Sequence, residues 1–158
     1  MGRCGRLLIS KTQGISQSSL CLSTNYNVKV NYKMTYLQFK EWAAGKLKLW
    51  GLYKPQVVEC LAMIAAHESL GCKHRRQIGG GPARGIFQME FTTHNSVWDT
   101  QDTINSRATK FGIKENPSLM ETSDDYALWV ARHYLLQDPN SIPTDPKAMS
   151  HYCKRYWN

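Results

Sequence analysis

Two acidic side chains flank a glycine-rich stretch in the middle of the chain. Glu68 stands in His67-Glu68-Ser69-Leu70-Gly71, and Glu90 closes Gly85-Ile86-Phe87-Gln88-Met89-Glu90. Residues 57–66, just before Glu68, are apolar nearly all round, which predicts a buried helix. A carboxyl group at the end of such a helix is partly desolvated, and desolvation raises its pKa so that it can donate a proton near neutral pH. Glu68 is therefore the first candidate catalytic residue.

The order and spacing of these motifs carry a family resemblance. Glu68-Ser69 followed by Gly85-Ile86-Phe87-Gln88 resembles the soluble lytic transglycosylase and goose-type lysozyme superfamily, which cleaves the glycan strands of peptidoglycan. The stretch 77–90, with Thr93-His94 after it, looks like the version found in bacteriophage virion and lysis proteins, and residues 151–158 resemble that group too. One departure is Phe91, which stands where such proteins commonly have proline.

The resemblance covers about residues 34 to 158 and implies a mainly α, lysozyme-like fold of the α+β lysozyme superfamily. It implies a peptidoglycan glycosidase, a muramidase or lytic transglycosylase, that acts on the β-1,4 bond between N-acetylmuramic acid and N-acetylglucosamine. Such a protein would be phage-encoded, located in the virion or at the host periplasm and cell wall, and used for wall penetration or lysis. Its partners would be glycan strands and other virion proteins, and its chemistry needs no cofactor or metal.

Each candidate residue also has a purely structural alternative. Glu68 would protonate the leaving oxygen, whereas most glutamates at helix ends only face solvent. Ser69 would orient the Glu68 carboxyl or a substrate group, or else serve as a helix-terminal hydroxyl. Gln88 would hold a sugar hydroxyl or N-acetyl group, and Gly85 would let the backbone approach a ligand, unless the two are a surface glutamine and a turn glycine.

Glu90 bears on the type of reaction. Its position matches an acid of goose-type lysozymes that can assist water, whereas many transglycosylases use one acid and let the C6 hydroxyl of the sugar attack. Two carboxylates roughly 6.5 to 9.5 Å apart suit inverting hydrolysis. The alternative is an ion pair of Glu90 with Arg84 or His94, and we expect His94 itself to be structural.

The aromatic side chains of the last two predicted helices suit core packing, with one or two left to stack on sugar rings. They are Tyr126, Trp129, Tyr134, Tyr152, Tyr156 and Trp157. Tyr156 is the preferred substrate-binding candidate because it lies in the block that resembles the family. A basic cluster, residues 73–76, could meet the acidic stem peptides of peptidoglycan, although a solvated loop is the commoner outcome.

Charge and composition divide the chain at residue 33. Of the net charge of +8, residues 1–33 carry five basic and no acidic side chains, whereas residues 34–158 carry 15 basic and 12 acidic ones. The first segment is polar and without periodicity, which predicts a basic, disordered tail or an upstream extension of a domain that starts at Met34. Only Leu7-Leu8-Ile9 follows Arg3 and Arg6, too short a run for the apolar region of a signal peptide.

Five cysteines, an odd number without short paired spacing, predict neither a disulfide framework nor a zinc site. We expect reduced thiols, with Cys60 in the core. A zinc protease is excluded because Gly71 takes the place of the second histidine in His-Glu-x-x-His. The glycine run 79–81 lacks the Gly-Lys-Ser or Gly-Lys-Thr ending of a phosphate-binding loop, and no apolar run is long enough to span a membrane.

Capping residues and helix breakers set the expected helices. The predicted helices run from Thr35 to before Gly51, from Pro55 to near Gly71, from Asn95 to Phe111, from Ser123 to about Gln137, and from Pro146 onward. Residues 72–84, with three consecutive glycines, are expected to form an irregular loop or short hairpin between the two motifs.

Two other functional classes stay open. The first is a virion structural component that keeps the lysozyme-like fold without activity, a reading that the departure at Phe91 supports. The second is a basic nucleic-acid-binding module, which rests only on the tail and the basic cluster. Strongly salt-dependent DNA binding would be needed to support it.

Overall fold

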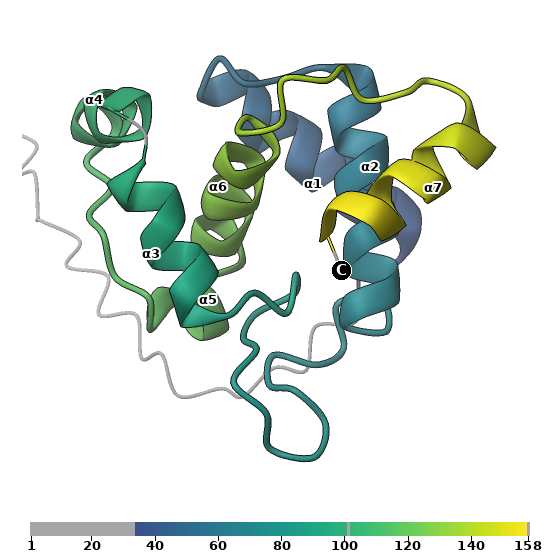
Figure 1. Cartoon of the computed structure of the whole chain (residues 1–158), viewed down its shortest axis with the longest axis horizontal. Helices are drawn as coiled ribbons and strands as arrows, with labels where there is room; N and C mark the ends of the chain where they lie inside the picture. Colours follow the sequence, from purple (N-terminus) through teal and green to yellow (C-terminus); the bar gives the residue numbers. More distant parts are fainter. Residues whose placement is uncertain (1–33, 101, 158) are drawn as a thin grey trace, which may run out of the picture. The chain divides into compact units, whose positions relative to one another are not determined.

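Helices dominate the part of the chain that the structure describes, as the prediction of a mainly α protein required (Figure 1). The computed structural model describes residues 34–100 and 102–157. Within them the helices are α1 (Tyr36–Leu49), α2 (Pro55–Glu68), α3 (Phe91–Asp99), α4 (Asp102–Phe111), α5 (Leu119–Thr122), α6 (Asp124–Leu135) and α7 (Pro146–Trp157). The predicted basic tail, residues 1–33, lies outside the described residues.

Local signals in the sequence account for where several helices begin. The Thr35 side chain accepts a hydrogen bond from the Gln38 N–H, and the Gln38 side chain bonds back to the Thr35 N–H, which makes a capping box. Pro55 occupies the first turn of α2, where its missing N–H costs nothing. Ser123 caps α6 by accepting from the Tyr126 N–H. The predicted starts of these three helices are confirmed.

The predicted third helix is wrong in its extent. A single helix was expected over residues 95–111, but α3 begins at Phe91 and ends at Asp99, and α4 begins at Asp102. The apolar positions of α3 and α4 keep a helical spacing across the break, so periodicity alone could not detect it. The four-residue helix α5 was not expected either, because so short an element has no periodic signal.

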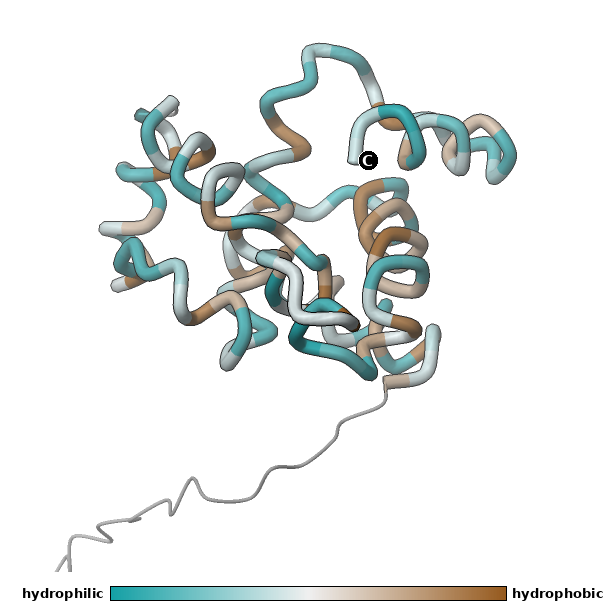
Figure 2. Tube along the Cα trace, turned by 60° about the horizontal axis from the view of Figure 1, so that its bottom comes forward, coloured by the Kyte–Doolittle hydropathy of each residue, from teal (hydrophilic) through white to brown (hydrophobic). Residues whose placement is uncertain are grey.

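Helices α2 and α6 each contribute more residues to the buried core than any other helix. Trp129 of α6 is fully buried and meets the ring of Trp50 edge-on, with 5.2 Å between ring centroids. Helices α1 and α7 both pack against α2, which is therefore covered from two sides (Figure 1). Hydrophobic and hydrophilic residues alternate along the helical traces in Figure 2, as expected for helices with one face in a core. Among the described residues, no helix has the length and apolar content to cross a membrane.

The segment between α2 and α3, residues 69–90, is irregular, as expected. Its only described β-type pairings are two isolated antiparallel bridges, Arg76 with Arg84 and Arg84 with Met89. Ion pairs attach it to the helices that follow. The guanidinium of Arg75 lies 2.6 Å from Asp124, and that of Arg76 lies 2.6 Å from Glu121. Two members of the predicted basic cluster thus fix the loop to α5 and α6.

Candidate functional site

The Glu68 side chain borders a cavity whose walls come from α2 and α7. The cavity holds about 310 Å³, at the lower end of the range usual for small-molecule sites, roughly 300–1,000 Å³. It is lined by Met63, Ile64, His67, Glu68, Ser150, Cys153, Lys154 and Trp157. On each helix these residues are three or four positions apart or adjacent, so they share one face. The cavity is thus formed by the facing sides of the two helices.

Glu68 ends α2 and is half-buried. Burial raises the pKa of the Glu68 carboxyl above its ordinary value, and the neighbouring charge of His67 opposes part of this rise. Desolvation has this effect because the charged form loses more hydration than the neutral form. A larger fraction of Glu68 is therefore protonated near neutral pH than of a solvent-exposed glutamate, as a proton donor requires.

Ser69 serves the chain reversal after α2 rather than the cavity. Its hydroxyl donates to the Ala65 carbonyl at 2.8 Å and accepts from the Cys72 N–H at 3.1 Å, and the residue is fully buried. Its carbonyl accepts from the N–H groups of Lys73 and His74 at 2.9 and 3.1 Å. The structure therefore gives the Ser69 hydroxyl the helix-terminal role, instead of a contact with the Glu68 carboxyl or with substrate.

The second motif forms a tight turn. Arg84 and Met89 exchange two backbone hydrogen bonds, of 2.9 and 3.0 Å. Inside the turn, the Gly85 carbonyl accepts from the backbone N–H of Gln88 at 3.1 Å and from its side-chain Nε2 at 2.8 Å. Gln88 has a φ of +48°, in the left-handed region. The side-chain amide of Gln88 uses one of its two hydrogens in this bond. Its Oε1 and its second amide hydrogen stay available for other contacts.

Gly85 is required by the protein's own packing. A Cβ atom at this position would lie 2.2 Å from the Met120 carbonyl oxygen, and φ is +76°. The Gly85 N–H donates to the Arg75 carbonyl at 2.8 Å. The sequence predicted that Gly85 lets a ligand come close to the backbone. In the structure, the group that comes close to Gly85 is the backbone of α5.

The turn reaches the cavity through Phe87. Its carbonyl accepts a hydrogen bond from Trp157 Nε1 at 3.1 Å, and the two rings lie 6.0 Å apart. Trp157 lines the cavity beside Glu68, whereas the predicted candidate Tyr156 does not. The Tyr156 ring packs on Tyr134 at 5.3 Å and stacks on Tyr152 at 5.7 Å. The aromatic side chain at this cavity is therefore Trp157, and the substrate-binding role of Tyr156 stays a prediction.

Glu90 is exposed at the N-terminus of α3 and is not among the residues that line the cavity with Glu68. Within the described residues no ion pair involves it, so the predicted alternative of a pair with Arg84 or His94 is not seen. Arg84 lies 3.6 Å from Glu121 instead. His94 is fully buried and its Nε2 lies 2.8 Å from the Tyr126 hydroxyl, which makes it a structural residue as expected.

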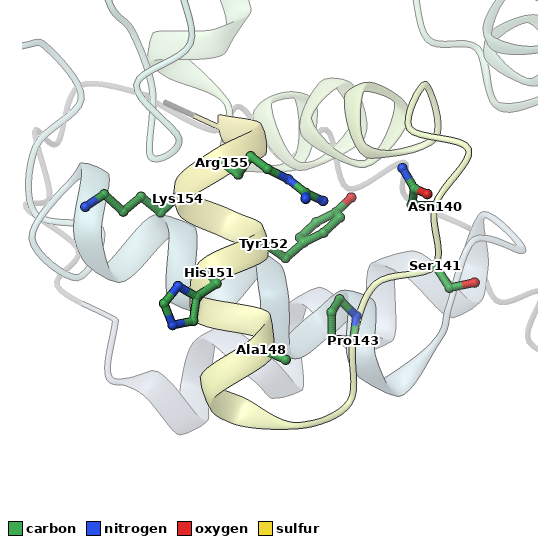
Figure 3. Close-up of a pocket in the computed structure, with 8 residues that line it drawn as sticks. All are labelled: Asn140, Ser141, Pro143, Ala148, His151, Tyr152, Lys154 and Arg155. Carbon is green, nitrogen blue, oxygen red and sulfur yellow. The ribbon is translucent and has the colours of Figure 1, made fainter.

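A second, larger cavity of about 710 Å³ lies on the other side of α7 (Figure 3). Figure 3 shows the side chains of Tyr152 and Arg155 extending toward Asn140, whereas Lys154 points the opposite way. Lys154 lines this cavity as well as the one beside Glu68. Lys154 therefore borders the hollows on both sides of α7.

Helix α7 supplies three cavity residues that the sequence did not point to, Ser150, Cys153 and Lys154, beside the aromatic candidate Trp157. Ser150, Cys153, Lys154 and Trp157 share one helical face, and this spacing is the signal that could have grouped them. Among the described residues, no group of three His, Cys, Asp or Glu side chains is arranged to hold a metal ion. Comparison of the chain with protein-family models, with curated proteins and with solved structures gives no match.

Proposed function

We propose that the protein cleaves the β-1,4 bond between N-acetylmuramic acid and N-acetylglucosamine in peptidoglycan, with Glu68 as the general acid, and that its domain is lysozyme-like. The observation that carries the proposal is the Glu68 carboxyl: it is half-buried, its pKa is raised by burial, and it borders a cavity of about 310 Å³. A perturbed carboxyl group in a hollow of this size is a common mark of a catalytic site. The resemblance of the two motifs to phage transglycosylases supplies the substrate class.

The reaction begins with proton transfer from Glu68 to the glycosidic oxygen. The bond from that oxygen to the anomeric carbon breaks, and the muramic acid ring passes through an oxocarbenium-like state. The C6 hydroxyl of the same ring then attacks the anomeric carbon, and the Glu68 carboxylate accepts the hydroxyl proton, which restores the acid. One carboxyl group thus serves as acid and then as base, and general acid catalysis of this kind contributes about 10²- to 10⁴-fold.

The other wall of the cavity is suited to a glycan. The Trp157 side chain is held by its hydrogen bond to the Phe87 carbonyl, so an aromatic ring stands at a fixed position against which a sugar can pack. Lys154 contributes a cation at the same cavity, and the carboxylates of the stem peptides are anions that it can pair with. Trp157 and Lys154 would therefore position the strand while Glu68 acts on the bond.

The single-acid route is favoured over hydrolysis assisted by Glu90, because Glu90 is not part of the lining of the Glu68 cavity. The products distinguish the two routes. Attack by the C6 hydroxyl gives a 1,6-anhydro sugar that is lighter by one water than the hydrolytic product. A use in phage wall penetration or lysis, and a location in the virion or at the host wall, belong to the same proposal.

The test is digestion of purified peptidoglycan by the full chain, with mass analysis of the released fragments. Glu68→Gln removes the proton donor with little change of shape, so we expect turnover to fall by at least about 100-fold while the fold is kept. Glu41→Gln is the matched control, because Glu41 is an exposed glutamate on α1. We expect this variant to retain full activity.

Two results would count against the proposal. Unchanged turnover in Glu68→Gln would remove Glu68 from the mechanism. A folded wild-type protein that releases no fragments would favour the alternative of an inactive virion protein with this fold. Circular dichroism of each sample establishes that the protein is folded before its activity is compared.

A further inference from the structure

Two cysteines far apart in sequence meet between α2 and α7. The Sγ atoms of Cys60 and Cys153 lie 3.3 Å apart, although 93 positions separate the residues in the chain. Both are free thiols in the structure, and Cys60 is fully buried, as expected. Their proximity could not be read from the sequence, because it depends on how α7 returns to α2. A disulfide needs an S–S distance of about 2.05 Å, so the sulfur atoms have only about 1.3 Å to close.

The two thiols differ in access and in acidity. Cys153 is half-buried and lines the cavity beside Glu68, so a small reagent can reach it. The hydrogen bond from Cys60 lowers the pKa of Cys153, whereas that same contact and burial raise the pKa of Cys60. Cys153 is therefore the thiol that first becomes a nucleophile, and Cys60 is placed directly behind it to complete the exchange.

We propose that Cys60 and Cys153 form a disulfide-forming site that a low-molecular-weight disulfide, such as oxidised glutathione, converts into an intramolecular bond. The Cys153 thiolate attacks one sulfur of the reagent, the reagent's S–S bond breaks, and one glutathione thiolate leaves. The Cys60 sulfur then attacks the Cys153 sulfur, the bond from Cys153 to glutathione breaks, and the Cys60 proton passes to the departing sulfur, so that the second glutathione leaves as a thiol. The protein loses two electrons and two protons, and the reagent becomes two molecules of glutathione.

The bond would fix α7 against α2. These are the two helices whose facing sides form the cavity, and Cys153 itself belongs to the cavity wall. A cross-link between residues so distant in sequence also restricts the unfolded chain strongly. Oxidation would therefore stabilise the fold and hold Lys154 and Trp157 in place opposite Glu68. The inference does not depend on the proposed glycosidase activity, since it concerns only the two thiols.

The experiment exposes the full chain to oxidised glutathione, blocks the remaining thiols by alkylation, and maps the peptides without a reducing agent. We expect a peptide with Cys60 joined to one with Cys153, lighter by two hydrogen atoms than the two together. Cys153→Ser should abolish it. Cys72→Ser should keep it, because Cys72 is another buried thiol outside the pair. The melting temperature of the oxidised wild type should rise by about 5 °C or more and return after reduction with dithiothreitol.

Three outcomes would overturn the proposal. One is a stable mixed disulfide of Cys153 with glutathione and no cross-link. Another is a cross-link from Cys60 to a different cysteine. The third is the absence of any reaction at Cys153 under conditions in which a small model thiol reacts.

Discussion

Glu68 and the loop that follows it, from Ser69 to Gln88, use their polar groups differently. Glu68 of the first motif borders a cavity and is partly desolvated without a described hydrogen-bond partner for its carboxylate. In the loop that follows, Ser69, Gly85 and Gln88 bond to or pack against the protein itself. The partly desolvated Glu68 carboxyl therefore lowers the stability of the fold, whereas the hydrogen bonds and close packing of the loop residues raise it. A motif typical of an active site therefore need not place each of its residues in contact with a ligand.

One contact connects the two regions. The Phe87 carbonyl in the second motif accepts a hydrogen bond from Trp157, which lines the Glu68 cavity. The buried Ile86 and Phe87 anchor the turn in the core, and the ring of Phe87 also meets Phe39 of α1 at 6.1 Å. The second motif therefore acts on the cavity by positioning its wall, in addition to whatever its remaining polar atoms bind.

The largest expected effect on stability is that of Gly85→Ala. The new Cβ would meet the Met120 carbonyl at 2.2 Å, and the residue would have to adopt a φ of +76°. Strain and overpacking together should lower the free energy of unfolding by about 3 kcal/mol or more. Gly80→Ala is the matched control, because its φ is +87° but nothing lies within 4 Å of the added atom. It should lose only about 1 kcal/mol, from backbone strain.

Urea unfolding of both variants measures the difference. Equal losses in Gly85→Ala and Gly80→Ala would show that the Met120 contact does not require the glycine. The original expectation, that Gly85 lets the backbone approach a ligand, would then regain support. In that case Gly85 would no longer be an example of a loop residue that is required by the protein's own packing.

Trp157→Phe tests the contact between the two regions. The change keeps an aromatic ring but removes the N–H that bonds to the Phe87 carbonyl, so stability should fall by about 1–2 kcal/mol. If Trp157 positions the glycan, turnover of peptidoglycan should fall several-fold as well. Tyr156→Phe is the control, because among the described residues its hydroxyl makes one long hydrogen bond, of 3.4 Å to the Tyr134 carbonyl. An equal loss of activity in both variants would mean that the hydrogen bond of Trp157 does not position the glycan.

The stability of Glu68→Gln as a function of pH measures how much the buried Glu68 carboxyl destabilises the fold, separately from its role in catalysis. Burial raises the folded pKa above the ordinary value of 4.5, so the folded state holds its proton more tightly than the unfolded state. The stability that Glu68 contributes is present below that value and is lost as pH rises through the folded pKa. Glutamine does not titrate. The variant should therefore match wild type near about pH 4 and exceed it by up to about 1 kcal/mol near pH 8, a limit that allows for solvent screening.

Thermal unfolding followed at a series of pH values measures this gain. A variant that is less stable than wild type at high pH would mean that the Glu68 carboxylate is stabilised by a partner in the protein. Glu41→Gln again serves as the reference, because an exposed side chain on α1 should show no such trend.

Local signals predicted the helices better than they predicted the site. The capping residues Thr35 and Ser123 and the helix-starting Pro55 mark helix ends through bonds within a few positions, so they could be read directly. The break between α3 and α4 was missed because the apolar spacing continues across it. Asp102, an acidic residue in the first turn of α4, was the available sign of a new helix start.

The site depends on contacts between distant segments, which the sequence does not display. Glu68 could be chosen because the apolar run before it predicts desolvation. The roles of Gly85 and Ser69 could not, because they depend on where the Met120 carbonyl and the Cys72 N–H lie. Trp157 was considered but ranked below Tyr156, since only the orientation of α7 decides which of two adjacent aromatic rings faces the cavity.

The smallest effect is expected for Glu90→Gln. Glu90 is exposed, caps α3 only through its backbone, and is not part of the Glu68 cavity lining. Stability should stay within about 0.5 kcal/mol of wild type, and the rate of glycan cleavage should change less than about threefold. The products should be 1,6-anhydro sugars in both proteins. A large loss of rate in Glu90→Gln, with full-mass reducing products from wild type, would make Glu90 the base of a hydrolase and bring the second motif into the chemistry itself.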